Sequence, residues 1–203
     1  MLRLYTSPTT PFGRKAMVLI LEAGLADQVE IAQATGSPLD SSKMPLSQNP
    51  LGKIPALERG DGPAIYDSRV ICRYLDDRAG AGLYPPAPRL WETLTLEATA
   101  DGMIEAAILM LYEGRLRPEE KRFDGWVEGQ WAKIARALDT LEGRWMSHLN
   151  GPLDMGQIAI GVALSYLDFR FDARGWRQGR PELARWHEAF AERESMAATV
   201  PQG

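Results

Sequence analysis

The sequence predicts an α/β segment of about eighty residues followed by an all-helical segment. Short strand-like and helix-like patterns alternate at the start of the chain, whereas apolar residues recur only at helical spacing toward its end. Between the two lies GAGLYPPAP, residues 80–88, which contains three prolines and two glycines and breaks any regular element. With 203 residues, 45% of them hydrophobic, the chain can bury one sizeable core or two small ones.

A βαβ unit is expected first. LRLY at residues 2–5 has the composition of a strand, and a helical run from Pro11 to about Gly24 follows it. VEIA at residues 29–32 predicts a second short strand. A helix that connects two strands in this way favours parallel pairing between them.

A ββα unit is expected next. IPALE at residues 54–58 and AIYDS at residues 64–68 have strand character, and the glycine-rich turn between them predicts a hairpin. A helix from Ser68 to about Ala79 completes the unit, whose sheet is therefore mixed. We place an α/β domain at residues 1–80, a linker at 81–88 and an all-helical domain at 89–203.

The helical segment has three marked elements. Helices are expected from about Leu90 to Arg115 and from about Phe123 to Leu149, and a third opens at Asp154. Asp154 and Gln157 have the spacing of a capping box, in which each side chain bonds the backbone N–H of the other residue. Because the helix that follows is nearly all apolar, we expect it at the centre of the domain.

Composition excludes several classes of function. The 23 basic and 27 acidic residues and a pI near 5.3 argue against nucleic acid or an anionic membrane as partner. The apolar run MVLIL is too short for a signal peptide, and no run approaches a membrane span. A single cysteine, Cys72, excludes an intrachain disulfide, and His148 and His187 lack metal-ligand spacing. The cytoplasm is the expected location.

TTPFGRK, residues 9–15, has the form of a redox motif Cys-Pro-Tyr-Cys without its sulfurs. Thr10 stands at the first cysteine position and Gly13 at the second. Thr10 precedes Pro11, a residue favoured at the first helical position, so Thr10 is expected to be the N-cap. Its hydroxyl either only caps the helix, a contribution of about 1 kcal/mol, or donates to the sulfur of a small thiol substrate at the positive helix end.

Two further stretches fit the ends of a peptide-like ligand. Ile54-Pro55 opens a strand, so either the strand lies at an edge with a trans proline, or the bond is cis and the Ile54 backbone can pair with an extended peptide. Ser68 is expected to cap the next helix, either as a simple cap or by holding a carboxylate while Asp67 takes an ammonium group. A thiol, a peptide unit and an amino-acid head together match glutathione.

The chain resembles the glutathione S-transferase superfamily, of the bacterial type with serine or threonine at the active site. The resemblance rests on SPTTPFGRKAMVLI, NPLGKIPAL, YDSRVICRYL and LDMGQIAIGVALSYLDFRF, which span both segments. It implies a thioredoxin-like N-terminal domain, an all-helical C-terminal domain, a homodimer, and glutathione as substrate with no metal.

The resemblance also implies a role for several residues. Pro55 would be the family's cis-proline, Ile54 would pair with the cysteinyl unit, and Lys53 would approach the glycyl carboxylate. Asp67 and Ser68 would hold the γ-glutamyl end. Thr10 would activate the sulfur, with Ser7 and Thr9 as other hydroxyls nearby, whereas Tyr5 is interpreted as a packing residue.

The expected acceptor site lies between the domains and is hydrophobic. Its candidate residues recur at helical spacing, apart from Phe12 in the first helix, which we also assign to glutathione binding: Phe12, Met103, Ile104, Ile108 and Tyr112. The same stripe would also serve as ordinary core or as a dimer contact. Arg115 and Arg117 are interpreted as surface or interface charges.

The resemblance implies a glutathione transferase that conjugates the thiolate of glutathione to a hydrophobic electrophile, an activity of the detoxification type. Glutathione-dependent reduction of a disulfide or peroxide is a possible side activity. A second hypothesis is a non-catalytic glutathione-binding or protein-interaction scaffold with the same fold. A thiol-disulfide oxidoreductase that uses its own sulfur is excluded, because no cysteine lies near Pro11.

Overall fold

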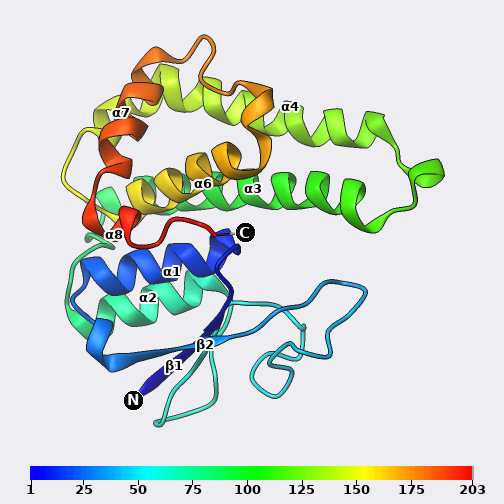
Figure 1. The fold of residues 1–203 in the computed structure, drawn as a ribbon. Coiled ribbons are helices and arrows are strands. Elements are labelled where there is room, and N and C mark those ends of the chain that lie inside the picture. The colour runs from blue at the N-terminus through cyan, green and yellow to red at the C-terminus, as the bar shows by residue number, and fades with distance from the viewer. Residues whose placement is uncertain (203) are drawn as a thin grey trace. The chain divides into compact units, whose positions relative to one another are not determined.

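The computed structural model describes residues 1–202 and divides the chain into two compact units (Figure 1). The first unit comprises Met1–Pro85 together with the C-terminal segment from Glu194, and the second comprises Pro86–Arg193. The sequence places that C-terminal segment in the helical domain instead. None of the helices in the described chain is both long and apolar enough to cross a membrane.

A three-stranded mixed sheet forms the base of the first unit. β1 (Leu2–Thr6) lies in the middle, parallel to β2 (Val29–Gln33) and antiparallel to β3 (Ala56–Glu58). The predicted mixed sheet is therefore confirmed. The predicted second strand of the hairpin is wrong: only an isolated bridge between Leu57 and Ile65 forms there, because the chain turns into the next helix within three residues of Ile65.

Two helices pack against each other in the first unit, α1 (Pro11–Glu22) and α2 (Ser68–Ala79). A single 3-10 turn, η1 (Ala26–Gln28), leads into β2. The C-terminal segment adds α8 (Glu194–Ala197), which packs on α1. Ser195 donates a hydrogen bond to the Glu22 carboxylate at the end of α1, so the end of the chain is part of this unit.

The second unit is all-helical, as predicted. Its elements are α3 (Arg89–Leu116), η2 (Glu119–Lys121), α4 (Asp124–Thr140), the π-helical turn η3 (Leu141–Trp145), α5 (Met146–Leu149), α6 (Met155–Phe171), η4 (Asp172–Arg174) and α7 (Pro181–Ala191). The predicted helix over residues 123–149 is confirmed in extent, since the chain is helical from Asp124 to Leu149, but the π-helical turn η3 divides it into α4 and α5, which the sequence did not predict. The prediction for α6 is confirmed, because its residues are buried almost throughout its first twelve positions.

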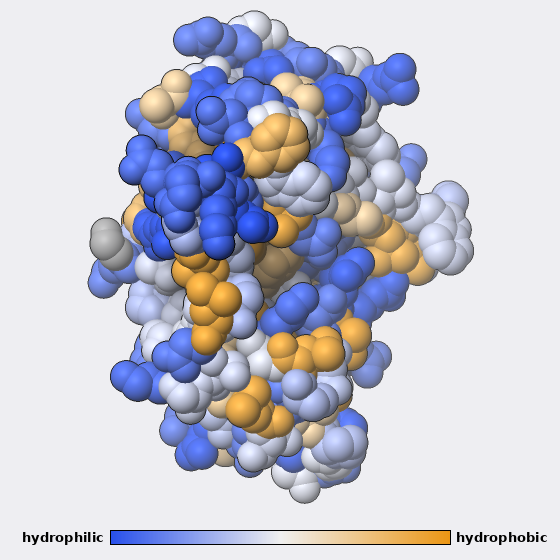
Figure 2. Space-filling view, turned by 90° about the vertical axis from the view of Figure 1, so that its right-hand side faces the viewer, coloured by the Kyte–Doolittle hydropathy of each residue, from blue (hydrophilic) through white to orange (hydrophobic). Residues whose placement is uncertain are grey.

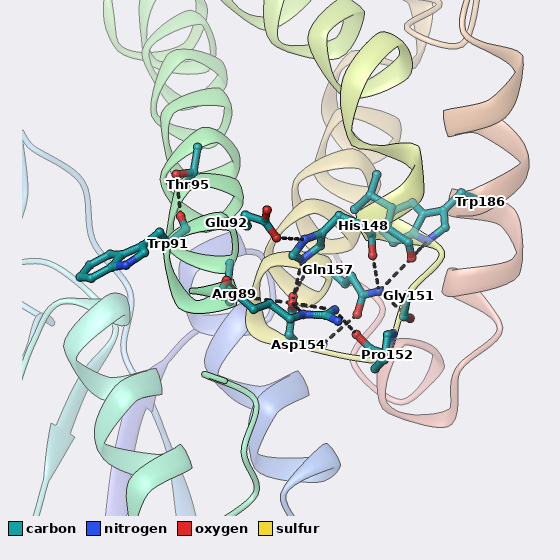
Figure 3. Close-up of polar contacts among 12 residues, drawn as sticks. Arg89, Trp91, Glu92, Thr95, His148, Gly151, Pro152, Asp154, Gln157 and Trp186 are labelled. Carbon is teal, nitrogen blue, oxygen red and sulfur yellow. Dashed lines mark hydrogen bonds and ion pairs between the residues drawn. The ribbon is translucent and has the colours of Figure 1, made fainter. Parts of the chain in front are cut away.

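The start of α6 is held by a dense polar cluster (Figure 3). The predicted capping box is present: the Asp154 side chain accepts from the Gln157 N–H at 3.2 Å, and the Gln157 side chain accepts from the Asp154 N–H at 2.8 Å. Arg89 and His148 both point at the Asp154 carboxylate, with His148 Nε2 2.7 Å from Oδ2. Thr93 donates to the same oxygen at 3.0 Å. This carboxylate joins three helices.

Exposed apolar side chains are scattered. Figure 2 shows small hydrophobic patches separated by hydrophilic residues on the face that it presents. The large apolar residues that are most exposed, apart from the terminal Met1, are Leu39, Leu51, Trp91 and Phe123. Scattered apolar residues of this kind are normal on protein surfaces.

Candidate functional site

Strand register brings the three sequence features to one edge of the sheet. Tyr5 pairs with Ala56, so the end of β1 lies opposite the start of β3, where Ile54-Pro55 stands. The bridge between Leu57 and Ile65 runs antiparallel to β3, so the chain after Ile65 returns toward that same edge and reaches Asp67. The predicted thiol, peptide and amino-acid sites are therefore neighbours in the first unit.

Thr10 is the N-cap of α1, as predicted. Its backbone is extended, with φ −84° and ψ 120°, its C=O accepts from the Arg14 N–H at 2.9 Å, and Pro11 occupies the first helical position. The half-buried Thr10 side chain makes no capping hydrogen bond, however. No acidic residue lies in the first turn of α1 either, so the positive end of this helix is not neutralised by its own first turn.

The space of the second motif cysteine is occupied by another residue. A Cβ at Gly13 would lie 1.8 Å from Thr6 Oγ1 and 2.6 Å from Thr10 Cγ2. Thr6 is buried, and its hydroxyl has no hydrogen-bond partner among the described residues. Any side chain at residue 13 therefore requires Thr6 or α1 to move, which fits the departure of this motif from a two-cysteine redox site.

The Ile54–Pro55 peptide bond is cis, which decides between the two alternatives that the sequence left open. No backbone hydrogen bond within the described chain engages the N–H or the C=O of Ile54. The loop before it is braced by Asn49, which donates to the Lys53 C=O at 2.9 Å and accepts from the Leu51 N–H at 3.0 Å. The Lys53 side chain is exposed.

Asp67, and not Ser68, is the N-cap of α2, which corrects the prediction. Asp67 Oδ1 accepts from the Arg69 N–H at 3.0 Å, and Ser68 is the first helical residue, 2% exposed. Asp67 is the better cap because its backbone is extended and its carboxylate accepts from the N–H of the residue two positions later, which has no partner within the helix. Burial raises the pKa of Asp67, but hydrogen bonds from Arg69 and the charges of Arg69 and Lys15 outweigh it, so this pKa lies below its usual value.

Two buried cations of α1 follow closely after Thr10 in the chain, and the sequence analysis did not single them out. Arg14, one turn beyond Thr10, donates to Met196 C=O at 3.0 Å and to Thr199 Oγ1 at 3.3 Å, and burial lowers its pKa to about 10. Lys15 is fully buried, and its charge acts on Asp67. The available signal was a charged pair in the first turn of a helix that is otherwise apolar as far as Leu21.

Tyr5 is engaged elsewhere. Its hydroxyl donates to Glu58 Oε2 at 2.7 Å across the sheet, and this hydrogen bond to a carboxylate raises the pKa of Tyr5. The phenol is therefore already paired with a carboxylate of β3. Thr10 therefore stays the predicted hydroxyl for contact with the sulfur of the thiol substrate.

The predicted acceptor residues differ in exposure. Met103 and Ile104 are buried, whereas Phe12, Ile108 and Tyr112 are half-buried. On α3, Ile104, Ile108 and Tyr112 share one helix face at four-residue spacing. Whether they contact an electrophile stays a prediction.

The second unit contains a Ser–His–Asp arrangement that lacks the chemistry of a hydrolase. His187 Nε2 lies 3.0 Å from Ser165 Oγ, and Nδ1 lies 3.7 Å from Asp168 Oδ2. The Arg177 guanidinium, which only donates, lies 3.2 Å from Nδ1, so Nδ1 accepts and Nε2 carries the proton. His187 then donates to Ser165, whose hydroxyl donates to Gly161 C=O, which is the reverse of a general base.

Comparisons with known proteins give the same assignment as this geometry. The family model of the glutathione S-transferase N-terminal domain matches residues 9–78, and that of the C-terminal domain matches residues 124–189. The chain belongs to the glutathione S-transferase family. An Escherichia coli K12 relative named "Uncharacterized GST-like protein YibF" is 33% identical, with 98% of each chain covered.

Solved structures of glutathione transferase family members agree over the whole chain. One from Pseudomonas fluorescens Pf-5, with bound glutathione, is 41% identical at a TM-score of 0.97, with 100% of each chain covered. A second structure, also from P. fluorescens Pf-5 and 41% identical, has bound S-(propanoic acid)-glutathione, a TM-score of 0.92 and the same coverage. A glutathione S-transferase from Methylobacillus flagellatus, with glutathione bound, is 33% identical at a TM-score of 0.87, again with 100% of each chain covered.

Proposed function

We propose that this protein is a glutathione transferase that conjugates glutathione to a hydrophobic electrophile. The observation that carries the proposal is the Thr10 hydroxyl, which caps nothing and stands at the positive end of α1. Thr10 donates its hydrogen bond to the glutathione sulfur, and the helix dipole favours the thiolate over the thiol. The thiolate forms a carbon–sulfur bond while the electrophile's leaving group departs with the bonding electron pair, and the thiol proton goes to solvent.

The rest of the proposed glutathione site follows the edge of the sheet. Ile54 offers an N–H and a C=O, free of backbone hydrogen bonds in the described chain, to the cysteinyl unit as an added strand. Asp67 is held ionised by Arg69 and Lys15 and takes the γ-glutamyl ammonium group, and Ser68 with the first N–H groups of α2 takes its carboxylate. Lys53 is exposed and attracts the glycyl carboxylate. Relatives with bound glutathione support glutathione as the ligand of this site.

The proposal includes a homodimer in the cytoplasm. It assigns the acceptor pocket to Phe12, Ile104, Ile108 and Tyr112, and reduction of disulfides or peroxides by glutathione is a side activity of the same site. The scaffold hypothesis predicts glutathione binding without turnover, so the two are separated by measuring both.

Titration calorimetry with reduced glutathione, combined with initial rates on a chloronitrobenzene, tests the proposal. Ser68→Ala is expected to weaken glutathione binding by about tenfold, because a charge-assisted hydrogen bond is lost. Thr10→Ala is expected to retain binding and to lower kcat. Binding without any turnover in the wild-type protein would favour the scaffold, and absence of binding would refute both.

A further inference from the structure

The first turn of α1 leaves its capping N–H groups unpaired. Thr10 is the N-cap, yet its side chain accepts from neither Phe12 nor Gly13, and no other group of the described chain accepts from their N–H groups. A threonine at this position usually turns its hydroxyl oxygen toward these N–H groups, because the hydrogen bond stabilises the helix. The orientation of the Thr10 side chain therefore has a cause outside the helix backbone.

The methyl group of Thr10 stands beside Gly13, the third helical residue, whose N–H is a usual partner of an N-cap oxygen. Thr10 Cγ2 lies 2.6 Å from the position that a Cβ on Gly13 would take. Because Gly13 has no side chain, the methyl group can approach the helix backbone at this point. The hydroxyl and the methyl group share one tetrahedral carbon, so a methyl group directed at Gly13 turns the hydroxyl to another side.

Thr6 lies on the other side of the same space. Its Oγ1 is 1.8 Å and its Cβ 3.1 Å from the position that a Gly13 Cβ would take, so Thr6, Gly13 and Thr10 meet at one point. Thr6 is 1% exposed and ends β1, where its C=O accepts from the Ala34 N–H at 2.8 Å. The side chain that faces the Thr10 methyl group is therefore held by the backbone of the sheet.

Packing in the core does not explain the hydroxyl of Thr6. This hydroxyl is buried and has no hydrogen-bond partner among the described residues, although buried polar groups are nearly always paired. A valine would fill the same strand position without an unpaired polar atom. An oxygen, however, is smaller than a methyl group and can approach the Cα–H of a glycine closely. A methyl group in its place would crowd Gly13.

We propose that Thr6 and Gly13 form a socket for the Thr10 methyl group, so that the Thr10 hydroxyl is turned away from α1 and presented to the sulfur of glutathione. Thr6 is then a positioning residue, since it acts on the sulfur only through Thr10. This inference rests on the proposed transferase function, because it explains how the hydroxyl of that site is placed. A side chain that is already held in place loses less conformational freedom when it bonds the thiolate.

Three-bond NMR couplings from the backbone nitrogen and carbonyl carbon of Thr10 to its Cγ2 report this rotamer without any ligand. The wild-type protein is expected to show the couplings of a single χ1 rotamer. Thr6→Ala and Thr6→Ser both remove the Thr6 methyl group and differ only in the oxygen. Thr6→Ser should keep the single rotamer, and Thr6→Ala should show averaged couplings. Averaged couplings in the wild type, or a single rotamer in Thr6→Ala, would overturn the socket and leave the proposed function standing.

The pKa of the bound glutathione thiol and the midpoint of urea unfolding separate positioning from packing. In Thr6→Ala this pKa should rise by about half a unit above the wild-type value, because the released Thr10 hydroxyl can cap α1 instead. Thr6→Ser, the conservative variant, should stay close to the wild type. The urea midpoint of Thr6→Ala should nevertheless be no lower than that of Thr6→Ser, because the alanine removes an unpaired buried hydroxyl. The same thiol pKa in both variants would overturn the inference.

A double-mutant cycle tests whether the effect passes through the Thr10 methyl group. Serine at residue 10 has no such group, so Thr6→Ala should change the thiol pKa in the wild-type background and leave it unchanged in Thr10→Ser. An equal effect in both backgrounds would overturn the socket. If the wild-type protein binds glutathione without lowering its thiol pKa, the proposed function fails at the activation step, and this inference fails with it even where the Thr10 rotamer is single.

Discussion

The helices α1 and α6 both begin after an N-cap residue, but the side chains of the two N-cap residues differ in what they bind. Both follow a loop with an N-cap whose backbone is extended, Thr10 in the first unit and Asp154 in the second. Asp154 is 1% exposed, and its carboxylate accepts hydrogen bonds from a backbone N–H and from side chains of other helices. The half-buried Thr10 side chain caps nothing.

The difference shows how a structural cap is distinguished from a site. At α6 the protein supplies its own anion to the positive end of the helix, so that end is closed to a ligand. At α1 neither the cap nor the first turn supplies a negative charge, and the peptide-binding features lie at the same sheet edge. A cap that leaves its own helix unsatisfied is therefore the better candidate for ligand binding.

The largest expected effect on stability concerns Asp154, the N-cap of α6. Asp154→Ala is expected to lower the free energy of unfolding by about 3–5 kcal/mol, because it leaves Arg89, Thr93, His148 and the start of α6 without their shared acceptor. Chemical denaturation measures the loss. Asp154→Asn keeps the shape and should lose less. Equal stability of Asp154→Ala and wild type would mean that water replaces the carboxylate.

The next largest effect on stability is expected from substitutions of helical glycines, of which Gly13 and Gly156 lie in the first turns of α1 and α6. Gly13→Ala places a Cβ 1.8 Å from Thr6 Oγ1 and is expected to cost about 1–3 kcal/mol of stability, and to reduce turnover because Thr10 is displaced. Gly156→Ala, whose Cβ would lie 2.9 Å from Leu96 Cβ, should affect stability alone. Gly102→Ala on α3 has open space and should stabilise by up to about 1 kcal/mol. Thermal unfolding with activity assays compares the three, and an active, fully stable Gly13→Ala would contradict the tight fit.

The smallest expected effect on stability is at Thr10, the N-cap of α1. Thr10→Val keeps the branched shape and removes only the hydroxyl, so the free energy of unfolding should change by less than about 0.5 kcal/mol, because no capping bond is lost. Conjugation should nevertheless fall by about tenfold or more. Thr10→Ser restores the hydroxyl and should restore the rate. A loss of stability comparable to a normal cap, about 1 kcal/mol, would instead identify Thr10 as structural.

Local patterns predicted much of this structure. The capping residues Thr10 and Asp154, the helix α2 and the buried helix α6 follow from signals within a few residues of sequence. The mixed sheet follows from the order of its strands. Such features depend on spacing and on turn residues that the sequence displays directly.

Other features depend on contacts between distant residues. The choice of Asp67 over Ser68 as cap depends on which backbone becomes extended, and the clash at Gly13 depends on how α1 lies over Thr6. The π-helical turn at Leu141–Trp145 leaves no mark in an apolar periodicity that runs through it. The return of the C-terminal segment to α1 depends on Arg14 finding acceptors some 180 residues away. Tertiary contacts of this kind are not encoded in local patterns.

The pKa of the glutathione thiol in the bound complex tests the central claim most directly. Thiolate absorbance is followed across pH with glutathione saturating the wild-type protein and Thr10→Val. The free thiol titrates near about 8.5, and binding is expected to lower this value by about one unit or more in the wild type. In Thr10→Val the pKa of the bound thiol should lie close to that of free glutathione, while glutathione binds equally well. The same pKa in both proteins would contradict a role for the Thr10 hydroxyl in activating the sulfur.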